Sequence, residues 1–148
     1  MARVLVSSDH AGVETRAAIC QTLRALGHDA VDMGPTGSAP VDYPGFAHAL
    51  GRAVVNGEAD WGVLVCGSGI GMSIAANKIA GVRAALANDP YSARMAREHN
   101  DANVLCLGGR ILAPDTARAI VDTFLSPPFE GDGRHARRVG KIENSATS

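Results

Sequence analysis

Short apolar runs alternate with longer segments of helical periodicity along most of the chain. Runs with the length and β-branching of buried strands occur at 3–7, 29–33, 61–66, 82–87 and 103–107. A helical pattern follows each of them, at 13–26, 44–56, 71–79, 90–99 and 114–125. Strict alternation of strand and helix indicates a parallel sheet with helices on both faces. The pattern therefore predicts the α/β class, as a three-layer α/β/α sandwich of the Rossmann-like type around a five-stranded sheet.

Turn residues support these boundaries. Three prolines suit the first turns of predicted helices: Pro44, Pro90 and Pro114. Asp42 and Asp89 stand in capping positions before two helices, and Gly27 and Gly57 follow two helix ends. Parallel sheets of this kind commonly take the strand order 2-1-3-4-5, with a ligand crevice between the carboxyl ends of the first and third strands. We expect that order here and a site at that edge.

The pattern changes after residue 126. Residues 127–133, PPFEGDG, are a turn-rich link, and 134–142 predict one more helix, which is basic. That helix has little apolar face to bury by itself. We interpret the chain as a single domain, 1–148, in which 127–148 is a C-terminal arm that docks on another surface.

Composition limits the classes of protein. With 148 residues and 46% hydrophobic content, the chain is long enough for one core and short for two. Its formal net charge of −1 provides no global field for nucleic acid, and no apolar stretch approaches the roughly 20 residues that span a bilayer. An odd cysteine count without a secretory leader argues against a disulfide framework. We expect a cytoplasmic protein without nucleic-acid or membrane partners, with Cys20 and Cys106 in its core.

Residues 61–71, WGVLVCGSGIG, form the most informative segment. Cys66 stands at the carboxyl end of a predicted strand, and Gly67, Gly69 and Gly71 follow it. These glycines let backbone N–H groups at the start of the next helix approach an anionic oxygen closely. The same field favours a thiolate, so Cys66 is a candidate base or nucleophile near neutral pH. The alternative is a buried structural cysteine.

A second polar loop is expected to meet the first. Residues 7–12, SSDHAG, follow the first strand, so the topology places Asp9, His10, Cys66 and the hydroxyl of Ser68 around one crevice. Tyr43, beside turn residues, could line the same crevice. Taken singly, Asp9 and His10 could be solvated loop residues, but their convergence with Cys66 favours a site.

A nucleotide-binding module would also use a glycine-rich loop after a strand. The dinucleotide fingerprint, however, is G-x-G-x-x-G at the first strand–helix turn. Here the first turn is SSDHAG, and the glycines follow the third strand with G-x-G-x-G spacing. The spacing therefore opposes nucleotide binding.

Five motifs together resemble one known family. They are SDHAG at 8–12, DYP at 42–44, CGSGIGMSIAANK at 66–78, REHND at 97–101 and GRHARR at 133–138. In this order they are similar to the sugar-phosphate isomerase family that groups ribose-5-phosphate isomerase B with the galactose-6-phosphate isomerase subunits. The motif CGSGIG with IAANK is specific, whereas DYP alone would be weak.

The resemblance implies roles for individual residues. Cys66 matches the base that removes a proton from the carbon next to the carbonyl, and His99 matches the group that helps to open the sugar ring. Ser68 stands where many relatives have threonine, which keeps a hydroxyl able to relay a proton. Met72 replaces the glutamate that serves as base in a second branch of the family. The remaining matches are contacts to the substrate, its enediolate or its phosphate: Asp9, His10, Gly67, Gly69, Ile70, Gly71, Asn100, Arg110, Arg134 and Arg138.

The implied reaction explains these residue types. Isomerisation of an aldose to a ketose through a cis-enediolate needs a base poised near the working pH and fixed donors for the oxyanion. Imidazole suits ring opening, and guanidinium groups bind phosphate bidentately. No metal or other cofactor is expected, because the five histidines are scattered in the sequence.

The place of His99 in the chain predicts an assembly. It lies near the carboxyl end of the helix after the fourth strand, and ten helical residues carry the chain roughly 15 Å back toward the opposite edge of the sheet. We therefore expect a homodimer, or a dimer of dimers, in which His99 and arm arginines complete the partner's site. The alternative is that His99 simply caps a helix end.

Ribose 5-phosphate is the first choice of substrate, because base and ring-opening histidine lie on one chain. Tetrose and hexose phosphates remain alternatives. A further alternative is a phosphosugar-binding protein without turnover, which would not need both Cys66 and His99.

Overall fold

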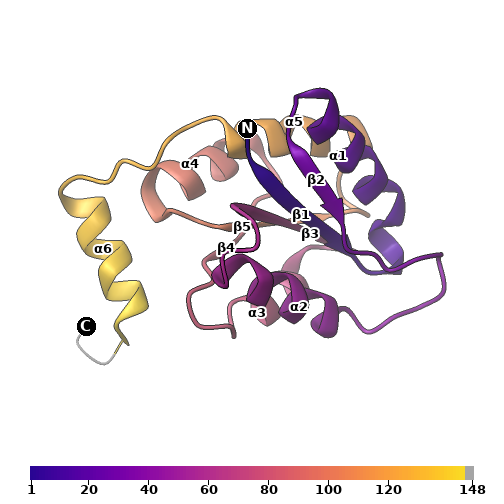
Figure 1. Ribbon diagram of the computed structural model, residues 1–148, viewed down its shortest axis with the longest axis horizontal. Helices are drawn as coiled ribbons and strands as arrows, with labels where there is room; N and C mark the ends of the chain where they lie inside the picture. Colours follow the sequence, from indigo (N-terminus) through magenta and orange to yellow (C-terminus); the bar gives the residue numbers. More distant parts are fainter. Residues whose placement is uncertain (146–148) are drawn as a thin grey trace.

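A parallel sheet of five strands forms the centre of the computed structural model, which describes residues 1–145 (Figure 1). The strands are β1 (Arg3–Ser8), β2 (Asp29–Asp32), β3 (Trp61–Cys66), β4 (Ala84–Leu86) and β5 (Val104–Gly108). Their order is β2-β1-β3-β5-β4, and every pairing is parallel. The α/β class predicted from the sequence is confirmed.

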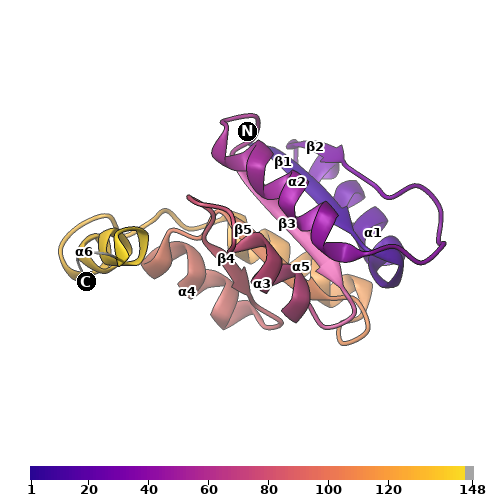
Figure 2. The same ribbon diagram turned by 90° about the horizontal axis from the view of Figure 1, so that it is seen from below.

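Helices cover both faces of this sheet (Figures 1 and 2). On one face lie α1 (Val13–Ala25), α4 (Pro90–Asn100) and α5 (Pro114–Leu125), which share a buried cluster around Ile19, Leu23, Ile120 and Phe124. On the other face lie α2 (Tyr43–Val55) and α3 (Ile70–Ala76), which share a second buried cluster with the sheet around Leu50, Leu64 and Met72. A short 3-10 helix, η1 (His10–Gly12), joins β1 to α1. The arrangement is the predicted three-layer sandwich.

The strand order is where the sequence prediction was wrong. We expected 2-1-3-4-5, but β5 lies between β3 and β4. All five residues of β5 are buried, whereas β4 has three residues and leaves Leu86 39% exposed. An all-apolar strand gains most from a central position with neighbours on both sides, and a short, partly exposed strand suits an edge.

Element boundaries follow the predicted ones closely, because the local signals mostly operate as expected. The Asp89 carboxylate accepts a 2.7 Å hydrogen bond from the Ser92 amide at the start of α4. Asp42 precedes α2 without making a side-chain capping bond. Gly27 and Gly57 follow α1 and α2 with φ of +90° and +81°. The largest differences are α3, which spans Ile70–Ala76 rather than 71–79, and β4, which spans Ala84–Leu86 rather than 82–87.

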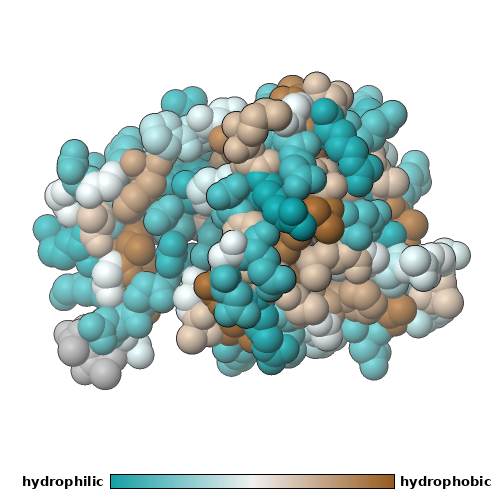
Figure 3. Space-filling model, in the orientation of Figure 1, coloured by the Kyte–Doolittle hydropathy of each residue, from teal (hydrophilic) through white to brown (hydrophobic). Residues whose placement is uncertain are grey.

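The C-terminal segment forms α6 (Arg134–Glu143), which stands to one side of the sandwich next to α4 (Figures 1 and 2). The Glu130 amide donates to the Glu98 carbonyl at 2.9 Å, and Arg83 pairs with Glu143 at 2.7 Å. Hydrophobic residues lie between hydrophilic ones along α6 in Figure 3, and Ile142 is exposed. Residues 146–148 of the predicted arm lie outside the described residues.

Within residues 1–145, no helix has the length and apolar character to cross a bilayer.

Candidate active site

The carboxyl ends of the three central strands meet at the site. Val65 of β3 pairs with Ser8 of β1, and Cys66 pairs with Gly108 of β5. The Asp9 amide then donates to the Val65 carbonyl at 3.0 Å, which binds the loop after β1 to the end of β3. An open cavity of about 650 Å³ lies here, lined by Asp9, Tyr43, Cys66, Gly67, Ser68, Ile70, Gly71, Ile74 and Arg110. The two polar loops predicted to converge therefore share one cavity.

The turn after β3 places an amide on the candidate sulfur. The Gly69 N–H donates to Cys66 Sγ at 3.2 Å, and Cys66 is 5% exposed. Gly69 has φ of +82°, and a Cβ at this position would lie 2.9 Å from the Leu107 carbonyl carbon. Only glycine fits this left-handed, tightly packed position. The glycine thus keeps the turn against β5 and holds its own N–H on the sulfur.

Tyr43 and Arg110 overlie the glycine loop from two sides. A Cβ on Gly71 would lie 2.5 Å from the Tyr43 ring, so the absence of a side chain lets the ring pack on the start of α3. A Cβ on Gly67 would lie 3.3 Å from Arg110 Nη1. The Arg110 amide donates to the Gly67 carbonyl at 3.1 Å, which ties the loop after β5 to the glycine loop, and Arg110 lines the cavity.

Ser68 and Asp9 each have one hydrogen bond that orients them. Ser68 Oγ accepts from the Ile70 amide at 3.2 Å, so its O–H can donate toward the cavity. Asp9 Oδ1 accepts from the Ala11 amide at 2.9 Å, and the Asp9 residue is buried. A carboxylate has more acceptor positions than this single bond uses. The Asp9 carboxylate can therefore accept a further bond from a sugar hydroxyl, and the Ser68 hydroxyl can donate one to it.

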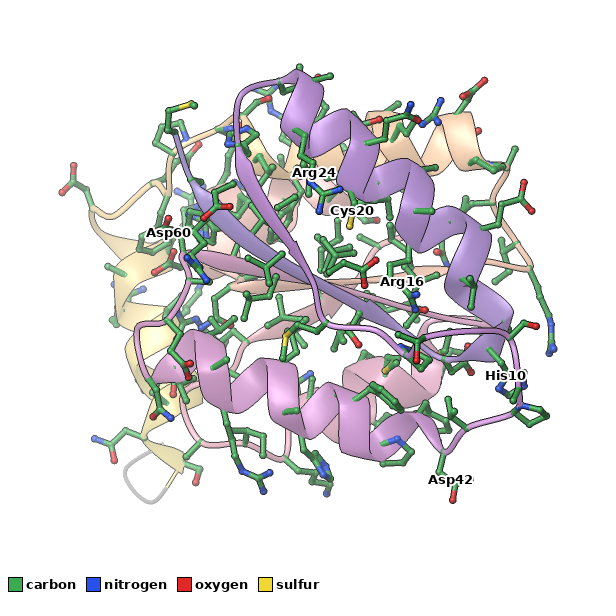
Figure 4. All side chains as sticks on the ribbon, turned by 45° about the vertical axis from the view of Figure 1, so that its right-hand side comes forward. His10, Arg16, Cys20, Arg24, Asp42 and Asp60 are labelled. Atoms are coloured by element: carbon green, nitrogen blue, oxygen red, sulfur yellow. The ribbon has the colours of Figure 1, made fainter. Side chains whose placement is uncertain are left out.

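His10 lies at the same end of the sheet but outside the residues lining the cavity. Its Nδ1 accepts a 3.2 Å hydrogen bond from the Val41 amide. In a neutral imidazole this leaves the proton on Nε2, which becomes the donor available to a ligand. Figure 4 shows His10 beside the loop that leads to Asp42.

Two residues that shape the site were missed by sequence reasoning. Asn88 follows β4, donates to the Ser68 carbonyl at 3.3 Å and accepts from the Gly108 amide at 2.9 Å. Arg16 projects from α1 toward the sheet (Figure 4) and donates to Ser8 Oγ at 2.6 Å. Neither belongs to a motif with a known chemical signature. The available signal for Asn88 was its position directly after a strand, at the edge where the site was expected.

The remaining predicted site residues lie at the opposite edge of the sheet. His99 and Asn100 form the last turn of α4, and Arg134 and Arg138 belong to α6. Asn100 borders a second cavity together with residues 79–85, which lead into the amino end of β4. Cys66 is at the carboxyl edge, so this chain by itself does not bring these residues to the sulfur.

The three cysteines have different surroundings. Burial raises the pKa of the Cys20 thiol, and the nearby Asp32 raises it further. Complete burial strongly raises the pKa of Cys106, with a contribution from Cys66. Cys20 belongs to one core cluster and Cys106 to the other, so both lie in the core as predicted. Cys66 is the cysteine that borders the cavity.

The histidines are less scattered in space than in sequence. The rings of His99 and His135 stack with centroids 4.0 Å apart, and Glu130 approaches both Nε2 atoms. Within residues 1–145, these three side chains are the group of His, Cys, Asp or Glu whose ligand atoms are close enough to hold an ion. The expectation of dispersed histidines was wrong here, because α6 folds back on the end of α4.

Comparisons with known proteins agree with this arrangement. Residues 4–142 match the family model described as Ribose/Galactose Isomerase. The chain is 43% identical over 142 residues to ribose-5-phosphate isomerase B of Escherichia coli, covering 96% of this chain and 95% of the relative. It is 40% identical over 144 residues to D-erythrulose-4-phosphate isomerase of Pectobacterium atrosepticum, covering 96% and 93%. The structure of type B ribose 5-phosphate isomerase from Trypanosoma brucei matches with a TM-score of 0.93 and 49% identity, covering 97% of each chain.

The parallel sheet, the thiol and glycine loop at its carboxyl edge, and these matches define an aldose–ketose isomerase. The chain belongs to the ribose/galactose isomerase family, and the resemblance inferred from its motifs is confirmed.

Proposed function

We propose that this enzyme interconverts ribose 5-phosphate and ribulose 5-phosphate through a cis-enediolate. The observation that carries the proposal is the cavity in which Cys66 Sγ, bonded to the Gly69 amide, lies between the Asp9 loop and Arg110. The 43% identity to the Escherichia coli ribose-5-phosphate isomerase B, along nearly the whole chain, supports ribose 5-phosphate as the substrate.

Cys66 acts as the base in this proposal. Its thiolate takes the proton from the carbon next to the carbonyl and returns it to the neighbouring carbon, so no net redox partner is needed. A well-placed base contributes typically 10²–10⁴-fold in rate. Backbone N–H groups of the 67–71 loop other than those of Gly69 and Ile70, which bond Cys66 and Ser68, stabilise the enediolate oxygen. Each such donor is worth about 2.7–4 kcal/mol.

The other cavity residues orient the open-chain sugar. The Ser68 hydroxyl moves a proton between the two oxygens of the enediolate, since its Oγ is held by the Ile70 amide and its O–H can turn inward. Asp9, Tyr43 and His10 bind sugar hydroxyl groups. Arg110, whose guanidinium lies above Gly67, binds an anionic oxygen of the substrate.

The ring-opening group comes from a second subunit in this proposal. His99 lies at the edge of the sheet opposite to Cys66, together with Asn100 and the arm that carries Arg134 and Arg138. Beside the Cys66 cavity, α3 exposes two large apolar side chains, Ile70 at 52% and Ile74 at 57%. A homodimer that covers these side chains with a partner would bring the partner's His99 and arm arginines toward the cavity.

A tetrose phosphate is the second candidate substrate. The observation in its favour is the 40% identity, over 96% of this chain, to the D-erythrulose-4-phosphate isomerase of Pectobacterium atrosepticum. The two sugars differ by one carbon, so the position of the phosphate-binding arginines relative to Cys66 decides between them.

The test is a panel of aldose and ketose phosphates of four to six carbons, assayed with the wild-type enzyme and Cys66→Ala. We expect the highest kcat/KM for ribose 5-phosphate and a loss of about 10²–10⁴-fold in the variant. Cys106→Ala is the matched control, because the Cys106 thiol is fully buried in the core. This variant should keep the catalytic rate of the wild-type enzyme. Higher kcat/KM for a four- or six-carbon sugar would reject ribose 5-phosphate, and undiminished activity of Cys66→Ala would reject the base.

A further inference from the structure

Three asparagine side chains around β4 bind backbone groups through the same pair of hydrogen bonds. Asn77 donates to the Ala84 carbonyl at 2.9 Å and accepts from the Ala84 amide at 2.8 Å. Asn103 donates to the Gly81 carbonyl at 2.9 Å and accepts from the Arg83 amide at 2.8 Å. These two asparagines therefore fix the segment that enters β4.

The third asparagine, Asn88, makes its pair of bonds at the other end of β4 and joins two different segments. Its Nδ2 donates to the Ser68 carbonyl in the glycine loop at 3.3 Å, and its Oδ1 accepts from the Gly108 amide at 2.9 Å. Gly108 in turn pairs with Cys66 across the sheet. A backbone N–H must face the oxygen of the side-chain amide and a carbonyl must face its nitrogen, so these partners fix the orientation of the Asn88 side chain.

The backbone on either side of Asn88 is itself anchored. The Ala87 amide donates to the Cys106 carbonyl at 3.1 Å, and the Asp89 carboxylate accepts from the Ser92 amide at 2.7 Å. Ala87 is buried and Asn88 is half-buried. The Asn88 side chain therefore extends from a fixed point toward the glycine loop.

The Ser68 carbonyl and the Gly69 N–H are the two ends of one peptide unit. This peptide bond is trans, so the unit is a rigid plane whose carbonyl and N–H point in opposite directions. Asn88 holds the carbonyl end, and the N–H end donates to Cys66 Sγ at 3.2 Å. A rotation of the plane that frees the carbonyl would also turn the N–H away from the sulfur.

Close packing against β5 fixes the position of this peptide unit. A Cβ on Gly108 would lie 2.9 Å from the Ser68 carbonyl oxygen, and a Cβ on Gly69 would lie 2.9 Å from the Leu107 carbonyl carbon. Such contacts keep the unit against the strand but have little directional preference. A hydrogen bond is directional, so the bond from Asn88 sets the rotation of the plane.

We propose that Asn88 is a positioning residue of the active site, which holds the Ser68–Gly69 peptide unit so that the Gly69 N–H stays directed at Cys66 Sγ. Hydrogen bonds in a chain polarise one another, so a donor on the carbonyl also strengthens the bond that the N–H makes. That bond is strongest when the sulfur carries negative charge. The effect of Asn88 on turnover rests on the proposed function, in which Cys66 is the base.

The first test measures how fast Cys66 reacts with iodoacetamide at pH 7, followed by peptide mapping with mass spectrometry. Cys20 and Cys106 are buried in the core, so they should not compete for the reagent. Because a bond to a charged acceptor is weakened, we expect the rate to fall roughly threefold or more in Asn88→Ala.

Asn103→Ala is the matched control, because it loses the same two kinds of bond from a half-buried position. It should react at the wild-type rate, and melting temperatures recorded on the same samples show that both variants are folded. Equal reaction rates in Asn88→Ala and Asn103→Ala would overturn the proposal.

Asn88→Asp separates the two bonds and replaces Asn88→Ala if that variant does not fold. Its carboxylate can still accept from the Gly108 amide but has no hydrogen to donate to the Ser68 carbonyl. The reaction is run in 1 M salt, where a Debye length of about 3 Å screens the added charge. We expect slower alkylation than in the wild-type protein under the same conditions, and a wild-type rate would overturn the proposal.

The second test measures steady-state kinetics with ribose 5-phosphate. Asn88→Ala should lower kcat roughly threefold or more and leave KM within about twofold, because the groups that contact the sugar remain in place. A higher KM at unchanged kcat would assign Asn88 to substrate binding and overturn the positioning role. Alkylation needs no turnover, so it decides the role of Asn88 even if the proposed isomerase reaction fails.

Discussion

The loop after β3 and the corner formed by α4, the link and α6 differ in how they are held. Around Cys66, backbone bonds lock the geometry: the Gly109 amide donates to the Cys66 carbonyl at 2.8 Å, and the Arg110 amide to the Gly67 carbonyl at 3.1 Å. Around His99, the side-chain contacts are a ring stack with His135 and the Glu130 carboxylate, whose Oε2 lies 3.8 Å from His99 Nε2 and 3.6 Å from His135 Nε2. The backbone geometry of the first region is held by its own chain, whereas the second region leaves its side chains available to a partner or a substrate.

The geometry of the Cys66 loop depends on the absence of a side chain at Gly71, so one added methyl group should disturb it. Gly71→Ala would place a methyl group 2.5 Å from the Tyr43 ring and push either the ring or the start of α3 aside. Because a displacement of about 1 Å at a reacting centre can cost roughly 10²-fold, we expect kcat/KM to fall by up to that factor.

The matched control is Gly45→Ala, in the first turn of the neighbouring α2, where a Cβ would meet nothing within 4 Å. That variant should keep both its activity and its melting temperature. Equal activity of the two variants, measured by the rate of ketose formation, would mean that the Tyr43 contact does not set the geometry of the site.

The dependence of the second region on a partner can be tested by mixing subunits. Cys66→Ala and His99→Asn should each be nearly inactive. In a dimer with shared sites, a one-to-one mixture forms half heterodimers, and one of the two sites in each is intact, so about a quarter of wild-type activity should return.

Co-expression with two affinity tags isolates the heterodimer and makes the measurement direct. Activity no greater than the sum of the separate variants would show that each chain completes its own site. The same samples, run on a sizing column, report whether two chains associate at all.

The smallest expected effect concerns the helix that carries His99. The Ser92 amide and hydroxyl lower the pKa of Asp89, chiefly through the amide bond. This cap therefore stabilises the fold above the ordinary carboxyl pKa near 3.8 and is lost as the pH falls through the lower value of the folded state. Asp89→Asn should reduce the melting temperature slightly at neutral pH and flatten its decline in acid.

Asp42→Asn provides the comparison, because Asp42 precedes α2 without a side-chain capping bond. It should leave the acid branch of the stability curve unchanged. Indistinguishable curves for the two variants, recorded by circular dichroism, would contradict the role of the Asp89 cap.

Local patterns in the sequence predicted most of the fold and the Cys66 half of the site. Strand β3 and helix α5 were predicted with their observed bounds, because apolar runs and first-turn prolines act within a few residues. The position of β5 between β3 and β4 was not predicted, since it depends on how much buried surface each strand gains from its neighbours.

The missed features of the site have the same origin. Asn88 acts by joining the Ser68 carbonyl to the Gly108 amide, residues 20 positions away in both directions. The stack of His99 on His135 depends on the path that the link takes back to α4. The hydrophobic periodicity of the sequence does not indicate that path. Sequence identified the residues with reactive chemistry, whereas the contacts that position them required coordinates.

The central place of β5 also has a consequence for how the polypeptide can be divided. If the backbone is cut between α4 and β5, the first piece contains β4 but lacks the strand that joins it to β3. The second piece brings that middle strand together with α5 and α6. Neither half can build a continuous sheet alone, so the two fragments must recombine before Gly108 can stand beside Cys66.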